Sequence, residues 1–178
     1  MSRGPWIQTR SGKAFHPLDP RPEDIELADV AHALANLCRY GGHSRRFYSV
    51  AEHSVHVSRF VPREHAMQAL LHDATEAYLV DVPKPIKPLL GGYDEIEASV
   101  WRAVAKRFLV PEELHESVHH ADVAVLLAEK EQLLGPSPMP WYETTIEPAE
   151  TGELLCLPPR EAKYLFLTRF AELSDVVR

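Results

Sequence analysis

The chain has 178 residues, a formal net charge of -7, 45% hydrophobic residues and 25% charged residues. This length and composition fit one packed domain spanning residues 1–178, and they exclude a collagen-like repeat, a disulfide scaffold and a disordered chain. The negative charge argues against a nucleic-acid polymer as partner, because such binding rests on many Lys and Arg contacts to phosphate.

No stretch approaches the roughly 18 consecutive apolar residues of a membrane-spanning helix, and the first ten residues lack the apolar core of a signal peptide. We therefore expect a cytoplasmic chain without a membrane partner. Cys38 and Cys156 are far apart and form no CxxC motif, so we expect two reduced thiols. The ten histidines, together with Asp and Glu, are instead a ligand set for Zn, Mn, Co or Fe.

Apolar residues recur at spacings of three and four along most of the chain, which predicts an all-α fold without a convincing strand. We expect a first helix over residues 26–38 and a second over residues 50–60, separated by a pair of glycines. Ser49 and Glu52 form an S-x-x-E capping box, in which both side chains are expected to pair with backbone amides at the start of the second helix.

Pro62 starts a third helix, which contains the dipeptide His72-Asp73 and is followed by a proline-rich loop. The segment 135–159 holds six prolines, and we interpret it as a long surface excursion. The prediction is therefore a bundle of about six helices. The remaining helices are expected over residues 93–108, 111–134 and 160–173.

Several polar residues interrupt faces that the helical pattern directs inward. Asp73 follows His72 in a stretch of Leu and Ala, where an ionised carboxylate is costly to bury unless it is paired or bound to a metal. Asp122 interrupts a later apolar run, and His53 lies on the apolar face of the second helix. Two imidazoles and two carboxylates suit Mn, Fe, Co, Zn or Ni and leave positions open for water.

Each of these residues alone has a simpler interpretation. A single inward histidine more often bonds to a carbonyl group, a single buried aspartate is often a cap or a salt-bridge partner, and a His-Asp dipeptide arises readily by chance. His56, one turn after His53, is an alternative ligand, and His119 is placed to line the same cleft as Asp122. The combination of inward residues on three helices favours the metal site.

The order of His53, His72-Asp73 and Asp122 resembles the HD-domain metal-dependent phosphohydrolases. The string HDATE (72–76) followed by DVP (81–83) looks like the HDxxE and DxP signature of the bacterial 5'-deoxynucleotidases. SVAEHS (49–54) is similar to their first-histidine segment, and LCRY (37–40) resembles the Arg-aromatic pair upstream of it. The small phage HD enzymes that remove triphosphate from deoxyadenosine nucleotides share this layout. The resemblance covers about residues 25–130.

This resemblance implies an HD-domain helical bundle and a metal-dependent phosphohydrolase that acts on deoxynucleoside 5'-phosphates and releases the nucleoside. One alternative is a triphosphohydrolase that converts dATP to deoxyadenosine and tripolyphosphate. Alternatives of another class are a non-catalytic HD module that binds a nucleotide and a scaffold with a purely structural metal. Enzymes of this size usually pair, and Trp101 and residues 136–141 offer apolar surface, so we expect a homo-oligomer, most simply a dimer.

The resemblance also implies the metal and its neighbours. The metal is a divalent ion such as Zn, Co, Mn, Fe or Ni, with Mg as a further choice for a triphosphate substrate. Glu76, one helical turn after the dipeptide, is placed to orient the attacking water or accept its proton. Asp81 is a candidate general acid or substrate anchor, and a turn residue that ends the helix is an equally good interpretation. The implied metal ligands are His53, His72, Asp73 and Asp122.

Cationic side chains flank these motifs although the chain as a whole is acidic. The resemblance places Arg39 in contact with the substrate phosphate, for which a guanidinium is well suited. Tyr40 is expected to stack on the base or to contact the sugar, with a role in the core as the alternative. The further candidate phosphate contacts are Arg45, Arg46 and Lys84.

Overall fold

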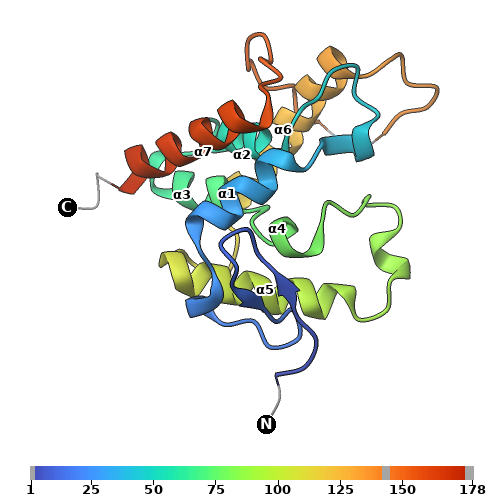
Figure 1. The fold of residues 1–178 in the computed structure, drawn as a ribbon. Helices are drawn as coiled ribbons and strands as arrows, with labels where there is room; N and C mark the ends of the chain where they lie inside the picture. Colours follow the sequence, from blue (N-terminus) through green and yellow to red (C-terminus); the bar gives the residue numbers. More distant parts are fainter. Residues whose placement is uncertain (1–2, 142–144, 175–178) are drawn as a thin grey trace.

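The computed structural model describes residues 3–141 and 145–174 (Figure 1). Within these ranges it contains seven α-helices and a single two-stranded sheet, so the expected predominantly helical fold is confirmed. None of the described helices has the length and apolar character needed to cross a membrane. The helices are α1 (Leu27–Asn36), α2 (Val50–Val57), α3 (Ala66–Leu71), α4 (Glu76–Leu79), α5 (Tyr93–Phe108), α6 (Glu116–Leu133) and α7 (Pro159–Ser174).

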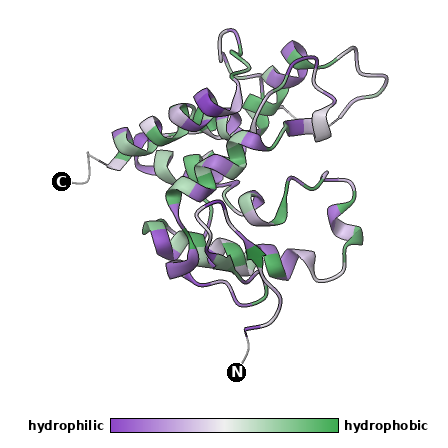
Figure 2. Ribbon diagram, in the orientation of Figure 1, coloured by the Kyte–Doolittle hydropathy of each residue, from purple (hydrophilic) through white to green (hydrophobic). Residues whose placement is uncertain are grey.

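The main hydrophobic core lies between α1, α2, α3, α5 and α7. Helix α7 packs against α1, α2 and α3, while α2 also contacts α6. In the view of Figure 1, α5 lies below α1 and α7 lies above it. The long helices carry hydrophobic and hydrophilic residues in alternating short runs, as Figure 2 shows for α5 and α7. Fully buried core residues include Leu34, Val55, Leu70, Leu71, Val104 and Phe166.

A short hairpin near the N-terminus was not predicted. Strand β1 (Ile7–Gln8) pairs antiparallel with β2 (Ala14–Phe15), and Ile7 lies opposite Phe15. Two residues per strand are too few to produce an alternating pattern in the sequence. Asp29 of α1 holds the hairpin, because its carboxylate accepts hydrogen bonds from the amide (2.9 Å) and hydroxyl (2.6 Å) of Ser11.

The prediction that His72-Asp73 lies inside one long helix is wrong. Helix α3 ends before His72, and a turn over residues 72–75 separates it from α4. The turn closes through short-range bonds from the amide of Ala74 to the carbonyl of Leu71 (2.8 Å) and from the amide of Glu76 to the carbonyl of Asp73 (3.0 Å). The two predicted ligands therefore project from a turn, which is why seven helices replace the expected six.

The expected start of the fifth helix at Pro111 is also wrong, since α6 begins at Glu116 with His115 as its cap. The side chain of Gln68 in α3 holds the intervening segment out of the helix. Its amide nitrogen donates to the carbonyls of Pro111 (2.9 Å) and Glu113 (2.8 Å), and its oxygen accepts from the amide of His115 (3.0 Å). A contact between distant segments thus overrides the local preference for a helix.

The capping box at the start of α2 forms only in part. The hydroxyl of Ser49 accepts from the amide of Glu52 (3.1 Å), as predicted. The carboxylate of Glu52 instead accepts from the amides of Cys156 (3.0 Å) and Leu157 (2.8 Å). Glu52 is fully buried, so it fastens the end of the proline-rich excursion to α2. The excursion is therefore a surface feature only in its first part, because Leu154 is also fully buried.

Candidate metal centre

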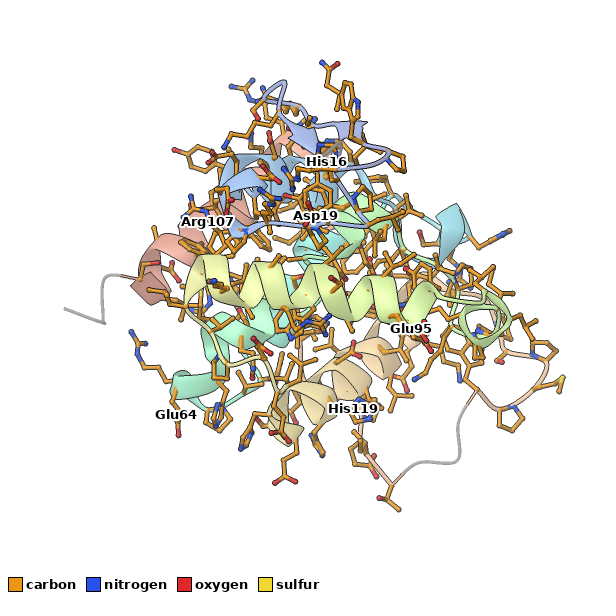
Figure 3. The ribbon with its side chains drawn as sticks, turned by 90° about the horizontal axis from the view of Figure 1, so that it is seen from below. His16, Asp19, Glu64, Glu95, Arg107 and His119 are labelled. Atoms are coloured by element: carbon orange, nitrogen blue, oxygen red, sulfur yellow. The ribbon has the colours of Figure 1, made fainter. Side chains whose placement is uncertain are left out.

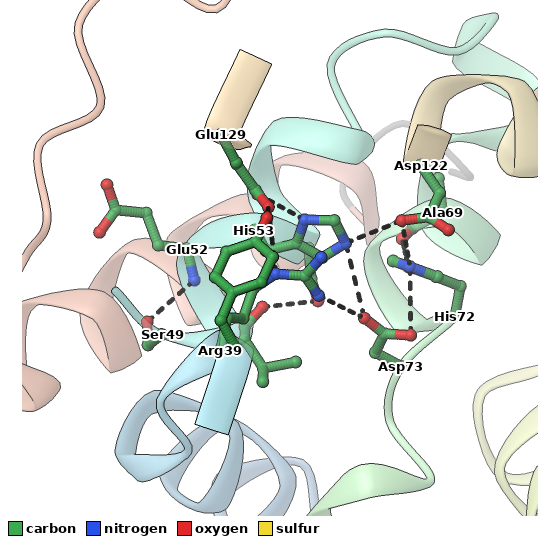
Figure 4. Close-up of polar contacts among 12 residues, drawn as sticks. Arg39, Ser49, Glu52, His53, Ala69, His72, Asp73, Asp122 and Glu129 are labelled. Carbon is green, nitrogen blue, oxygen red and sulfur yellow. Dashed lines mark hydrogen bonds and ion pairs between the residues drawn. The ribbon is translucent and has the colours of Figure 1, made fainter. Parts of the chain in front are cut away.

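Four predicted ligands converge from three parts of the fold (Figure 4). His53 comes from α2, His72 and Asp73 from the turn after α3, and Asp122 from α6. Nε2 of His53 lies 3.2 Å from Oδ1 of Asp122 and 3.5 Å from Oδ2 of Asp73. Nε2 of His72 lies 3.2 Å from Oδ1 of Asp73, and ligand atoms of His53, His72 and Asp122 all lie within 4.8 Å of one another.

Both imidazoles are held through their other ring nitrogen. Nδ1 of His53 lies 2.7 Å from Oε1 of Glu129, and Nδ1 of His72 lies 2.7 Å from the carbonyl oxygen of Ala69. A carbonyl oxygen can only accept, so Nδ1 of His72 carries a proton. In the neutral ring Nε2 then has the lone pair that can bind a metal. Histidines that bind metals are usually oriented in this way.

The two Nε2 atoms point into the cluster and have no hydrogen-bond partner among the described residues. Oδ1 of Asp122 lies 3.2 Å from Nε2 of His53, which is the distance of an ion pair when the imidazole is protonated. Buried polar atoms are almost always paired, so two unpaired nitrogens facing two carboxylates form a donor set that fits a divalent cation. The residues present are therefore suited to the metal that the sequence predicts.

The charges in the cluster respond strongly to one another. Burial raises the pKa of Asp122. The nearby His53, His72 and Arg39 lower it by a larger amount, so the net pKa lies well below its usual value. Burial and Arg39 lower the pKa of His53, whereas Glu129 and Asp122 raise it, with a net value of about 9. A metal that binds here must displace the proton from His53, which makes binding weaker at low pH.

Glu76 and Asp81 lie beside the cluster. Glu76 is the first residue of α4 and is buried, and its Oε2 atom has no hydrogen-bond partner within the described ranges. Burial, followed by the negative charges of Asp73 and Asp81, raises the pKa of Glu76 to about 9. Burial also raises the pKa of Asp81, which follows α4 and is half-buried.

Arg39 and Tyr40 also reach the cluster. Arg39 is buried, its Nε donates to Oε2 of Glu129 (3.1 Å), and its Nη1 lies 3.6 Å from Oδ2 of Asp73. The hydroxyl of Tyr40 donates to the same Glu129 oxygen (2.5 Å), and its ring lies 6.0 Å from that of Trp141. The phosphate-binding arginine implied by the resemblance therefore contacts a predicted metal ligand.

The other predicted cations are placed differently. The guanidinium of Arg46 donates to the carbonyl of Leu154 (2.7 Å), which holds it at the proline-rich excursion. Arg45 and Lys84 have exposed side chains on loops. The donor group within 4.8 Å comprises His53, His72 and Asp122, and Asp73 joins it only through its contacts with the two imidazoles. Neither alternative ligand belongs to this group, and His119 lies exposed on α6 (Figure 3).

Glu129 also belongs to the cluster, although the sequence pattern did not predict it. This residue lies on α6, seven positions after Asp122, and is fully buried. Its carboxylate contacts the side chains of His53, Arg39 and Tyr40. Burial raises the pKa of Glu129, but Arg39 and His53 lower it to about 2, so the group is ionised. The sequence does contain one signal for this role, because Asp122 and Glu129 are two helical turns apart on the same apolar face.

No protein-family model matches the chain. It is 37% identical over 172 residues to the uncharacterized protein YfdR of Escherichia coli, an alignment that covers 96% of this chain and 97% of YfdR. It is 36% identical over 144 residues to an uncharacterized protein of Rhodobacter capsulatus, covering 73% of this chain and 74% of that protein. At this identity and coverage, the chain belongs to the same protein family as YfdR.

Proposed function

We propose that this chain is an HD-domain metal-dependent phosphohydrolase that acts on deoxynucleoside 5'-phosphates and releases the nucleoside. The observation that carries the proposal is the pair of buried imidazoles, each held at Nδ1, whose unpartnered Nε2 atoms face Asp73 and Asp122. The resemblance of residues 72–83 to the HDxxE and DxP signature supports the same assignment.

His53, His72, Asp73 and Asp122 are the residues that would hold the metal. A divalent metal in such a site lowers the pKa of water and polarises a phosphoryl oxygen. Glu76 accepts a proton from the water that attacks phosphorus. Its carboxylate form is favoured when positive charge is added to the cluster, because an opposite charge nearby lowers the pKa of an acid.

The remaining residues bind the substrate and release the product. The guanidinium of Arg39 binds oxygens of the phosphate, since its Nη1 lies beside Asp73. The phosphorus–oxygen bond to the 5'-oxygen breaks, and Asp81 supplies the proton that the leaving oxygen needs. Tyr40 contacts the sugar closely and leaves little room for a 2'-hydroxyl, which favours deoxynucleotides.

The positions of the cations favour a monophosphate over a triphosphate. A triphosphate requires additional positive charge along its path. Arg46 is bonded to the carbonyl of Leu154, and Lys87 forms an ion pair with Glu97 (2.9 Å). Two of the cations near the metal motifs are thus engaged elsewhere, and Arg45 and Lys84 are exposed on loops. Arg39 is the cation with a described contact to the metal cluster, so we assign it as the principal phosphate contact.

The test is an assay of deoxy- and ribonucleoside mono-, di- and triphosphates with Mn, Co, Zn and Mg in turn, together with metal analysis. We expect orthophosphate and nucleoside from dAMP, and a much lower rate on AMP. Tripolyphosphate release from dATP without hydrolysis of dAMP would establish the triphosphohydrolase alternative. Nucleotide binding without phosphate release would establish the non-catalytic module.

A further inference from the structure

Glu129 connects the two halves of the candidate site, which are the metal-binding half with His53 and the phosphate-binding half with Arg39 and Tyr40. One carboxylate oxygen, Oε1, contacts Nδ1 of His53, which is a predicted metal ligand (2.7 Å). The other, Oε2, accepts from Nε of Arg39 (3.1 Å) and from the hydroxyl of Tyr40 (2.5 Å). Figure 4 shows this carboxylate reaching His53 and the Arg39 side chain from the opposite side to Asp73.

Glu129 needs these contacts because its carboxylate is buried. The side chain is fully buried, and an ionised carboxylate is retained in the interior only when its oxygens are paired. The segment that it holds is itself strained, because Tyr40 has a left-handed backbone (φ 58°) that is unfavourable for an aromatic residue. Glu129 therefore adds side-chain bonds to a segment that the backbone also holds, through the amide of Arg39 and the carbonyl of Tyr48 (2.9 Å).

We propose that Glu129 is a positioning residue that couples metal binding to phosphate binding. This inference rests on the proposed function and assigns no contact between Glu129 and the substrate. Oε1 fixes the ring of His53 with its Nε2 atom toward the cluster. Oε2 binds the Nε edge of Arg39, which turns the Nη1 end toward Asp73 and toward the place where a phosphate oxygen would lie.

Glu129→Gln is the decisive variant because it keeps the size of the side chain and removes its charge. An amide accepts through one oxygen only, so its NH₂ group must face either His53 or the pair Arg39 and Tyr40. Because the amide is also neutral, Arg39 loses its charge partner in either orientation. We expect the affinity for Mn²⁺ to fall by about 10- to 100-fold, the usual effect of removing the partner of a metal-binding histidine. We expect the affinity for inorganic phosphate, measured at saturating Mn²⁺, to fall by at least about tenfold.

Glu52→Gln is the matched control, because Glu52 is also fully buried and the described hydrogen bonds to its carboxylate come from backbone amides of the excursion. It should lower the melting temperature without changing either affinity. If Glu129→Gln does not fold, Glu129→Asp retains the charge but shortens the reach, and it should weaken both affinities in the same direction.

Calorimetric titration of Mn²⁺, followed by titration of phosphate, separates the outcomes. Loss of Mn²⁺ affinity with unchanged phosphate affinity would show that Glu129 serves His53 alone and would overturn the coupling. Two unchanged affinities would reduce Glu129 to a structural residue. Because neither titration requires turnover, a protein that binds Mn²⁺ and phosphate but hydrolyses no nucleotide refutes the proposed function and leaves this inference standing.

Discussion

The carboxylate of Glu52 accepts a hydrogen bond from the amide of Leu157, a residue 105 positions later in the chain (2.8 Å). Glu52 lies in the first turn of α2, one residue before His53. The bond therefore fastens the end of the proline-rich excursion to the helix that carries a predicted metal ligand.

Glu52→Ala should lower the free energy of unfolding by about 3 kcal/mol, because it leaves two amides unpaired and opens a cavity. Denaturant unfolding monitored by circular dichroism measures this change. Glu153→Ala, an exposed position in the same excursion, is the control and should change stability by less than about 0.5 kcal/mol. Equal effects of the two substitutions would contradict the anchoring role of Glu52.

Each of the substitutions His53→Ala, His72→Ala, Asp73→Ala and Asp122→Ala should lower the bound metal and abolish hydrolysis, because each removes a donor atom. Metal analysis after dialysis and a phosphate-release assay measure the two effects. His119→Ala, on the exposed side of α6, should behave as the wild type (Figure 3). Full metal retention by Asp122→Ala would remove that residue from the site.

Glu76→Gln should keep the metal and the fold but lose about 10² to 10⁴ in turnover, the usual contribution of a general base. The comparison is with Glu95→Gln, since Glu95 is exposed on α5 (Figure 3). The turnover number at saturating substrate and the metal content are measured together. Wild-type turnover in the Glu76 variant would show that the residue is structural.

The stability of the metal-free protein should fall as the pH drops from about 6.5 toward 4. Burial, followed by the charge of Arg59, lowers the pKa of His56 from 6.5 to about 4. The unfolded chain therefore binds this proton more readily, and stability is lost in that window by at most about 3 kcal/mol. Urea unfolding at several pH values should show a shallower decline for His56→Gln, and parallel declines would contradict this assignment.

We expect the protein to form a dimer in solution. Met139 (71% exposed) and Trp141 (39% exposed) lie in the expected apolar segment, and closed pairs are the commonest soluble oligomers. Trp101 contributes less surface than expected, because it packs against the core and donates to the carbonyl of Glu112 (2.6 Å). Light scattering at micromolar concentration gives the mass, and a monomer would end this prediction.

The sequence predicts the helices whose apolar residues repeat regularly. Ile96, Val100 and Val104 mark α5, whose observed range equals the expected one. The expected start of α6 was wrong because Gln68, more than 40 residues earlier, binds the segment that precedes it. Local periodicity contains no information about such a contact between distant segments.

The candidate site could be predicted where a polar residue interrupts an apolar pattern. His53 and Asp122 stand out in this way, and the structure brings them within 3.2 Å of each other. Glu129 interrupts the same face of α6 as Asp122. Its role depends on the positions of Arg39 and Tyr40, which are 90 and 89 residues away in sequence. Only the folded chain reveals that one carboxylate serves three partners.

The three segments that supply the cluster are separated by long stretches of chain, from His53 in α2 to Asp122 in α6. In an unfolded chain these donor atoms are dispersed, so an ion has high affinity only for the folded state. Metal binding therefore stabilises the folded state relative to the unfolded chain. A free ion concentration of 100 times the dissociation constant adds about 2.7 kcal/mol to the unfolding free energy, so thermal stability itself reports the metal supply.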